Sequence, residues 1–288
     1  MTQQANCFEL NGLELASYAQ DGYCIRRDLF NPTEVQQLLQ AIESATQRAR
    51  SLAPTGNTYY LDGKRFIDVG HLTLQYEHQA DSDELRVIEP VYELDERLDQ
   101  LADDPRLVHP MQQLIERDTL ALWTAKLNLK PARTGSGFGW HQDSPYWVHA
   151  SDDVDRLPNV YIALDDANER NGCLCAIRAS HKRGCLPGTS DGSQLGGFFT
   201  DPKLFEQADR VALEMRAGTV VFFDPHLVHG SAANPTDQPR RALIYTYQPG
   251  GLPALKSGKT RNVVPLGATA TARSSAGQGR PTKGPTRK

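Results

Sequence analysis

The residues Gly137-Phe-Gly-Trp-His-Gln-Asp143 are the most informative in this chain of 288 residues. In a strand, alternate side chains face the same way, so His141 and Asp143 are expected on one side and Gln142 on the other. An imidazole and a carboxylate directed to one point supply two of the three protein ligands of a non-haem iron site. The pair alone is a weak signal, and a surface histidine and aspartate after a glycine-rich loop is the more common explanation of it. A third ligand is needed to decide.

A second motif supplies that ligand. It is Phe222-Phe-Asp-Pro-His-Leu-Val-His-Gly-Ser231, which contains His229. Arg240 lies between this motif and an expected strand at 242–247. Arginine suits the binding of a carboxylate ligand, because its fixed fork pairs bidentately with a carboxylate and stays charged when buried. Arg241 is the competing candidate, but strand alternation turns it outward if Arg240 points inward. His226 is interpreted as a loop histidine in preference to a ligand.

The chain around these motifs consists of short strand-like runs separated by turns. They are expected at 120–129, 137–141, 160–164, 174–177, 211–215, 219–223 and 242–247. Many short strands separated by Gly, Pro and Asn are typical of an antiparallel sandwich or barrel. The predicted fold class is therefore mainly β with packed helices, namely a double-stranded β-helix, or cupin-like jelly roll.

The first 118 residues are expected to add mostly helices. A strand is predicted at 23–30, followed by a helix with Asn31 as its cap, Pro32 at its first position and Glu34 completing a capping box. Its core face is Val35, Leu38, Leu39 and Ile42. Residues 51–78 lack periodicity and are interpreted as an irregular wall or lid with short strands. Residues 83–118 are expected to be helical, with breaks at Pro105 and Pro110.

Bulk properties exclude several classes of protein. Five cysteines form no CxxC pair, which favours a reducing compartment over a disulfide framework. No apolar run is long enough for a bilayer and no secretory leader is evident, so a soluble cytoplasmic protein without a membrane partner is expected. Eight of the 31 Lys and Arg residues lie in 256–288, which holds no acidic residue. The acidic remainder argues against nucleic-acid binding.

The expected organisation is a single domain over 1–266, with its jelly-roll core at about 120–250. Residues 267–288 thin to Gly, Ser, Thr, Ala, Lys and Arg and are expected to form a disordered basic tail. A monomer or a homodimer is expected.

Taken together, these motifs resemble the phytanoyl-CoA dioxygenase family. The resemblance spans about residues 15 to 250 and includes Trp140–Asp143, the run from Ile162 to Leu174 with Asn171-Gly172, Ser180-His181 and Phe222–Ser231 with Arg240. One departure is Arg178-Ala-Ser-His181, where the family usually has Pro-Gly-Ser-His. This turn borders the pocket in relatives, so a reshaped turn is expected to affect substrate choice and not the metal.

The resemblance implies roles for individual residues. It implies iron(II) on the catalytic residues His141, Asp143 and His229, and 2-oxoglutarate on Arg240 and Ser231. Further residues implied for the oxoacid pocket are Lys126, Asn128 and Tyr161, although Lys126 is equally readable as a solvated strand lysine. Tyr146 and Trp147 are candidates for a substrate wall, with ordinary aromatic packing as the alternative.

The function implied is a dioxygenase that uses iron(II), O2 and 2-oxoglutarate to hydroxylate an unactivated C–H bond of a small-molecule metabolite, releasing succinate and CO2. Natural-product metabolism and stimulation by ascorbate are further expectations. Asp143 favours hydroxylation, because halogenating relatives replace this carboxylate with a small residue. Two alternatives remain: a cupin-type oxygenase without the oxoacid, and a catalytically silent jelly-roll protein that binds metal or oxoacid.

Overall fold

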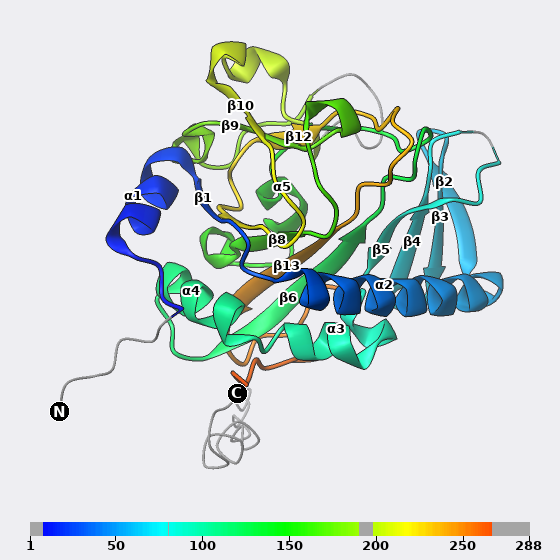
Figure 1. Cartoon of the computed structure of the whole chain (residues 1–288), viewed down its shortest axis with the longest axis horizontal. Helices are drawn as coiled ribbons and strands as arrows, with labels where there is room; N and C mark the ends of the chain where they lie inside the picture. Colours follow the sequence, from blue (N-terminus) through cyan, green and yellow to red (C-terminus); the bar gives the residue numbers. More distant parts are fainter. Residues whose placement is uncertain (1–7, 80, 190–197, 267–288) are drawn as a thin grey trace, which may run out of the picture.

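The computed structural model describes residues 8–79, 81–189 and 198–266. In these ranges the strands form two antiparallel sheets, one of nine strands in the order β1-β11-β8-β13-β6-β5-β4-β3-β2 and one of four in the order β10-β9-β12-β7. Figure 1 shows the smaller sheet above the larger one, with helices beneath. The predicted mainly β jelly roll is confirmed.

The strands lie close to the predicted positions in the second half of the chain. The larger sheet contains β1 (Tyr23–Arg26), β2 (Asn57–Leu61), β3 (Lys64–Val69), β4 (Leu72–Tyr76), β5 (Leu85–Glu89), β6 (Leu120–Asn128), β8 (Asn159–Ala163), β11 (Val220–Phe223) and β13 (Ala242–Pro249). The smaller sheet contains β7 (Phe138–His141), β9 (Leu174–Ile177), β10 (Arg210–Leu213) and β12 (His229–Ser231).

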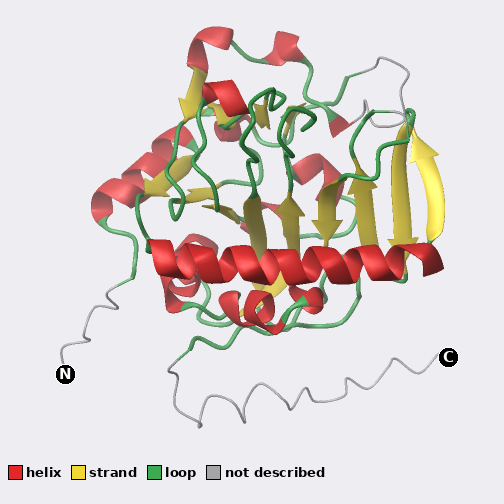
Figure 2. Cartoon of the chain, turned by 45° about the vertical axis from the view of Figure 1, so that its right-hand side comes forward, coloured by secondary structure: helices red, strands yellow, loops and turns green. Residues whose placement is uncertain are grey.

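Helix α2 (Pro32–Leu52) begins where the sequence predicts. Asn31 caps it and forms a capping box with Glu34, which satisfies free backbone N–H groups of the first turn. Val35, Leu38 and Ile42 are buried, and Leu39 packs partly buried against the same core. In Figure 2 the helix crosses the strands of the larger sheet. The other α-helices of the described residues are α1 (Gly12–Asp21), α3 (Glu96–Leu101), α4 (Pro105–Ile115) and α5 (Ser144–Trp147).

Two expectations for residues 51–118 are wrong in part. The helical assignment fails at 85–89, which forms strand β5 between β4 and β6. Pairing with a strand on each side gives the backbone N–H and C=O groups hydrogen-bond partners, which a helix of only five residues would not supply. Pro110 does not break α4. Residues 57–76 are an antiparallel meander, β2-β3-β4, that extends the larger sheet and is more regular than the irregular wall expected.

Strand alternation separates the core from an internal cavity. On neighbouring strands, Leu127 pairs with Leu243 and Leu243 with Ile162, and this row belongs to the core that faces the helices. The adjacent row, Lys126, Ile244 and Tyr161, has the opposite orientation and faces the smaller sheet. The larger sheet therefore presents polar side chains only on its inner face at these positions.

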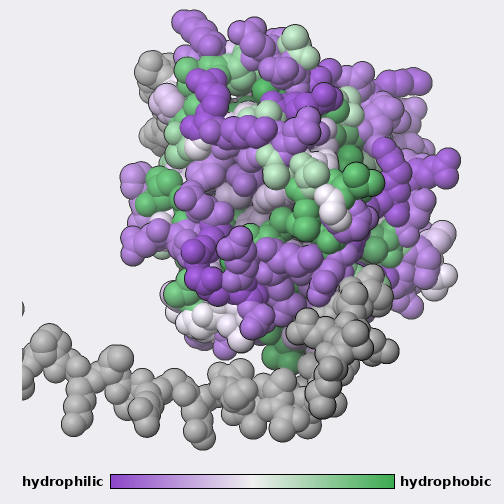
Figure 3. All heavy atoms as spheres, turned by 90° about the vertical axis from the view of Figure 1, so that its left-hand side faces the viewer, coloured by the Kyte–Doolittle hydropathy of each residue, from purple (hydrophilic) through white to green (hydrophobic). Residues whose placement is uncertain are grey.

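One face of the outer surface is mainly hydrophilic. On the face shown in Figure 3, hydrophilic side chains predominate and apolar ones gather in small clusters between them. Within the described ranges, no helix is long and apolar enough to cross a membrane. The predicted disordered tail, 267–288, lies outside the described residues.

Candidate active site

Three residues converge at one end of the smaller sheet. His141 ends β7 and His229 begins β12, and the two are direct cross-strand partners. Asp143 lies just beyond β7 and precedes α5, where its backbone is helical and its N–H donates to the carbonyl of Pro225. One potential ligand atom from each residue lies within 4.8 Å of the others. The convergence is as predicted, but Asp143 reaches it through a turn and not through strand alternation.

Both histidines are oriented by backbone carbonyls. Nδ1 of His141 lies 2.7 Å from the carbonyl oxygen of Gly139, and Nδ1 of His229 lies 2.9 Å from that of Leu227. A carbonyl can only accept, so each Nδ1 carries the proton and each Nε2 keeps a free lone pair. This is the arrangement expected of metal-binding histidines. Burial, followed by the neighbouring His229, lowers the pKa of His141 to about 3, so its ring is neutral at pH 7, as ligation requires.

The carboxylate of Asp143 has two side-chain partners. The amide Nδ2 of Asn159, a fully buried residue, donates to Oδ2 over 3.0 Å, and the ammonium of Lys126 lies 3.5 Å from Oδ1. Burial opposes ionisation, but Lys126 and the two histidines outweigh it and hold the pKa of Asp143 below its usual value. Two imidazoles and a carboxylate are a donor set that fits iron(II).

Asn159 is itself held in place by the neighbouring strand. The hydroxyl of Thr246, its cross-strand partner on β13, donates to Oδ1 of Asn159 over 2.6 Å. A reversed amide would direct an oxygen at the carboxylate of Asp143, so the observed orientation is the stable one. Thr246 and Asn159 therefore form a buried chain that ends on a metal-ligand candidate.

We predict that Asn159→Ala weakens Mn(II) or Co(II) binding by about 10- to 100-fold, the usual effect of removing a partner of a ligand. Isothermal titration calorimetry of the metal-free protein measures this effect without reference to turnover. Thr246→Ser keeps the hydroxyl and should bind nearly as well as the wild type. Unchanged affinity in Asn159→Ala, with normal circular dichroism, would contradict the role.

Arg240 is buried beside these residues and points inward. Its side chain donates to the hydroxyl of Tyr161 over 3.1 Å and to Oγ of Ser231 over 3.3 Å, and its Nε has no partner within the described chain. Arg241 instead pairs with Asp165 at 2.7 Å. The directions of the two arginines are those that alternation predicts. Arg240 is thus a buried cation with an unsatisfied donor, which suits an incoming carboxylate.

Two further basic residues near Arg240 were not anticipated. Arg86 on β5 donates to the carbonyl of Gly137 over 2.7 Å and lies 3.6 Å above the Phe138 ring. Lys130 is fully buried, and burial together with Arg240 and Arg86 lowers its pKa to about 6. Arg86 is a charged residue between the apolar residues Leu85 and Val87. Its position at the site could not be recognised while 85–89 was assigned to a helix.

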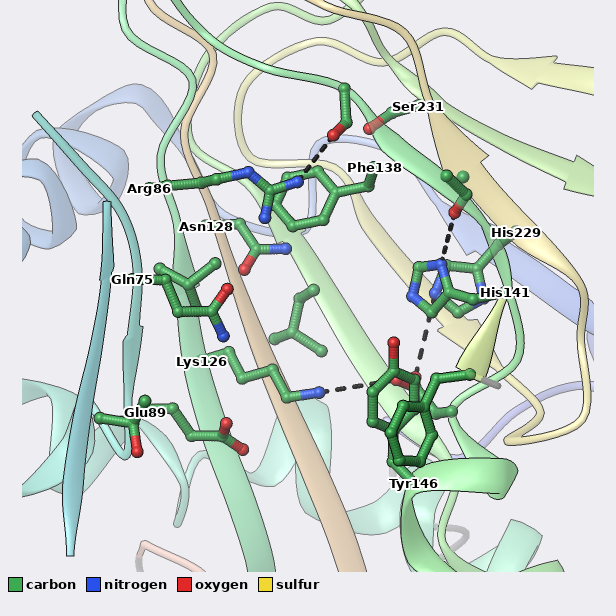
Figure 4. A pocket seen from close by; sticks show the side chains of 18 of the residues that line it. Gln75, Arg86, Glu89, Lys126, Asn128, Phe138, His141, Tyr146, His229 and Ser231 are labelled. Atoms are coloured by element: carbon green, nitrogen blue, oxygen red, sulfur yellow. Dashed lines mark hydrogen bonds and ion pairs between the residues drawn. The ribbon is translucent and has the colours of Figure 1, made fainter. Parts of the chain in front are cut away.

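The candidate residues surround one cavity of about 560 Å³, which lies in the usual size range of ligand pockets. All ten predicted site residues line it: Lys126, Asn128, His141, Asp143, Tyr146, Trp147, Tyr161, His229, Ser231 and Arg240. Figure 4 shows the histidines and Tyr146 on one side, facing a wall that contains Asn128 and Lys126. The lid expected from 51–78 contributes residues of β2, β3 and β4 to this cavity.

The two aromatic candidates differ in their surroundings. Tyr146 is 39% exposed and stacks on Phe198 with ring centroids 4.4 Å apart, so it stands at the cavity surface. Trp147 is 1% exposed and packs edge-on against Trp123, although its ring also lies 5.4 Å from the ammonium of Lys126. Tyr146 fits a substrate wall better, and Trp147 combines lining with ordinary packing.

His226 has a structural environment. Its ring nitrogens lie 2.8 Å from the hydroxyl of Ser144 and 2.7 Å from the carboxylate of Asp155. It is not part of the three-residue cluster found in the described chain. With both nitrogens engaged, His226 braces the start of α5 immediately after Asp143.

The turn at Arg178-Ala179-Ser180 keeps a glycine-like backbone. Ala179 has φ of 60°, in the left-handed region that glycine adopts without strain. The Ser180 hydroxyl accepts from the N–H of Val228 over 2.8 Å. Ala179 thus adopts a left-handed conformation at this turn, and Ser180 ties the turn to Val228, the residue before His229.

A model of the family described as Phytanoyl-CoA dioxygenase (PhyH) matches residues 18–242. The ectoine dioxygenase of Streptomyces avermitilis is 33% identical over 183 residues, which cover 59% of this chain and 61% of that protein. That alignment thus spans less than two thirds of the relative. The ectoine dioxygenase of Bordetella parapertussis is 28% identical over 259 residues, covering 83% of this chain and 75% of that protein.

Solved structures agree with these relatives. EctD from S. alaskensis, crystallised with 2-oxoglutarate and 5-hydroxyectoine, matches with a TM-score of 0.65 and 25% identity over 86% of this chain and 78% of that one. SnoK, a non-heme alpha ketoglutarate dependent carbocyclase from nogalamycin biosynthesis, matches with a TM-score of 0.60 and 19% identity over 96% of this chain and 94% of that one. At 19% identity, SnoK supports the fold alone.

Proposed function

The chain belongs to the phytanoyl-CoA dioxygenase family and is a dioxygenase dependent on iron(II) and 2-oxoglutarate, and we propose that it hydroxylates an unactivated C–H bond of a small-molecule metabolite. Succinate and CO2 are the products from the oxoacid. The observation that carries the proposal is the shared cavity, in which the His141, Asp143 and His229 cluster lies together with the buried, incompletely satisfied Arg240.

Each group in the cavity has a task in this reaction. His141, Asp143 and His229 would hold iron(II) on one face, and bound iron supplies O2 activation coupled to oxidation of the oxoacid. Arg240 and Ser231 bind the distal carboxylate of 2-oxoglutarate, with Tyr161 fixing the guanidinium and Asn128 lining the same pocket. Lys126 neutralises Asp143. Tyr146 and the meander limit access of water and orient the substrate.

Two other functions give different results in one assay. A cupin-type oxygenase without the oxoacid would not use Arg240, and a silent binding protein would not turn over. Succinate formation is measured with Fe(II), ascorbate and 2-oxoglutarate, both without and with candidate metabolites. Ectoine is tested first, because the relatives are ectoine dioxygenases. Succinate that depends on both iron and 2-oxoglutarate supports the proposal. Its absence, despite metal binding, supports the two alternatives, neither of which converts 2-oxoglutarate to succinate.

The catalytic domain is proposed to end near Leu266. The segment before it is fixed to the body: the guanidinium of Arg261 pairs with Asp99 at 2.9 Å and with Asp103 at 2.6 Å, and the N–H of Leu266 donates to the carbonyl of Asp103. We predict that a chain ending at Leu266 keeps full turnover and the same melting temperature as the whole chain. A loss of turnover with unchanged circular dichroism would show that the basic tail takes part.

Three further features complete the proposal. Ascorbate is expected to stimulate turnover by returning oxidised iron to the ferrous state. Cys24, Cys173, Cys175 and Cys185 are free thiols among the described residues, which favours a reducing compartment such as the cytoplasm. The enzyme is proposed to work as a monomer or homodimer on a dissolved small molecule of natural-product metabolism. Nucleic acid is not proposed as a partner.

A further inference from the structure

Glu89 on β5 is a buried acid for which the proposed reaction has no use. Its side chain lines the cavity, and the residue is only 7% exposed. One carboxylate oxygen, Oε1, accepts from the hydroxyl of Thr124 over 2.6 Å. Among the described residues, no Lys, Arg or His forms an ion pair with the Glu89 carboxylate. Such a carboxylate is costly to bury unless a partner reaches it.

The sheet directs Glu89 toward the cavity together with other polar groups. Glu89 is the cross-strand partner of Thr73 on β4, and Gln75, two residues further along β4, pairs with Val87. Alternation therefore places Thr73, Gln75 and Glu89 on the same inner face as Lys126. Figure 4 shows Gln75, Glu89 and Lys126 along the wall opposite the histidines. This polar wall faces the metal-ligand candidates across the space left for a substrate.

The cations that line this part of the cavity have other partners. The ammonium of Lys126 is 3.5 Å from Asp143, and that of Lys256 donates to the hydroxyl of Thr73 over 3.0 Å. Arg86 reaches the carbonyl of Gly137 at the oxoacid end. Glu89 lies beside Lys126 across the sheet, since Val87 and Ile88 pair with Asn128 and Leu127, but Lys126 is in an ion pair with Asp143. Glu89 is thus a carboxylate with no ion-pair partner among the described residues, at the substrate end of the cavity and apart from Arg240.

We propose that the substrate is a small polar metabolite carrying a basic nitrogen, an amine or amidine, which Glu89 binds as its cation while Gln75 supplies an additional hydrogen bond. This inference rests on the proposed function. A buried carboxylate selects a cation over a neutral analogue because the analogue leaves the charge unpaired. The same wall disfavours a purely hydrocarbon substrate, which would leave Gln75 and Glu89 unsatisfied.

The experiment compares matched compounds. The iron-loaded protein is supplied with 2-oxoglutarate and with primary-amine metabolites, each beside its N-acetyl derivative, and with ectoine; succinate formed above the substrate-free rate is measured. The expected result is that at least one basic compound stimulates turnover and that its N-acetyl form loses about 30-fold or more in kcat/KM. Equal stimulation by the two forms, or none by any basic compound, would overturn the proposal.

Variants separate recognition from structure. Glu89→Gln keeps the acceptor for Thr124 and removes the charge, so it should lower the amine to N-acetyl preference to near unity while the 2-oxoglutarate Kd stays within about twofold of the wild type. Glu93→Gln, which removes an acid paired with His71 outside the cavity, should keep the preference. An unchanged preference in Glu89→Gln would refute the role of Glu89. Failure of the wild type to bind 2-oxoglutarate would instead refute the proposed function.

Discussion

Asp143→Ala is expected to abolish both iron-dependent turnover and metal-dependent stabilisation. The variant removes one of three ligand candidates and leaves Lys126 and Asn159 without the carboxylate that they contact. Loss of a ligand should exceed the roughly 100-fold upper range for loss of a ligand's partner. Metal at about 100 times its Kd stabilises a protein by about 2.7 kcal/mol. Wild-type protein should therefore melt higher with Mn(II), and the variant should not.

The matched control is Asp155→Ala. Asp155 is an exposed acid whose carboxylate touches His226 at 2.7 Å and no member of the cluster among the described residues. It should keep the Mn(II)-dependent rise in melting temperature and most of the turnover. If Asp143→Ala still shows the full rise, then the metal is bound elsewhere and the assignment of the three ligands fails. If both variants lose it, the effect belongs to the loop and not to the carboxylate.

The parts of the site that were predictable are those encoded in short stretches of sequence. His141, Asp143 and His229 belong to two local motifs, and the opposite directions of Arg240 and Arg241 follow from adjacent positions on one strand. Strand alternation nevertheless does not account for the position of Asp143. β7 ends at His141, so strand geometry orients the histidine only, and the carbonyl of Pro225 sets the turn that brings Asp143 back.

The residues that were missed act through long-range pairing. Asn159 reaches Asp143 because β8 lies beside β13, where Thr246 is its direct neighbour. Glu89 reaches the cavity because 85–89 is a strand between β4 and β6. A run of five residues carries too little periodicity to distinguish a strand from part of a helix. Once that run was assigned to a helix, neither Arg86 nor Glu89 could be placed at the site.

Arg240 allows the oxoacid to be tested separately from the metal. It donates to Tyr161 and Ser231 and contacts none of the three ligand candidates through a described hydrogen bond or ion pair. Arg240→Ala should therefore leave Mn(II) or Fe(II) affinity largely unchanged. It should weaken 2-oxoglutarate binding steeply, because truncating one partner of a buried charge pair costs about 2–5 kcal/mol, or about 30- to 4000-fold. Arg240→Lys keeps the charge without the planar fork and should fall between.

The control is the neighbouring residue. Arg241→Ala removes a partly exposed pair with Asp165 on the outer face, and such pairs contribute about 0–1 kcal/mol to folding, so 2-oxoglutarate affinity should hardly change. Both variants are loaded with Fe(II) without oxygen, and 2-oxoglutarate is titrated while the metal-to-ligand charge-transfer absorbance is followed. Weak binding in Arg241→Ala alone would reverse the assignment of the two arginines. Wild-type affinity in both would mean that the buried cation does not hold the co-substrate.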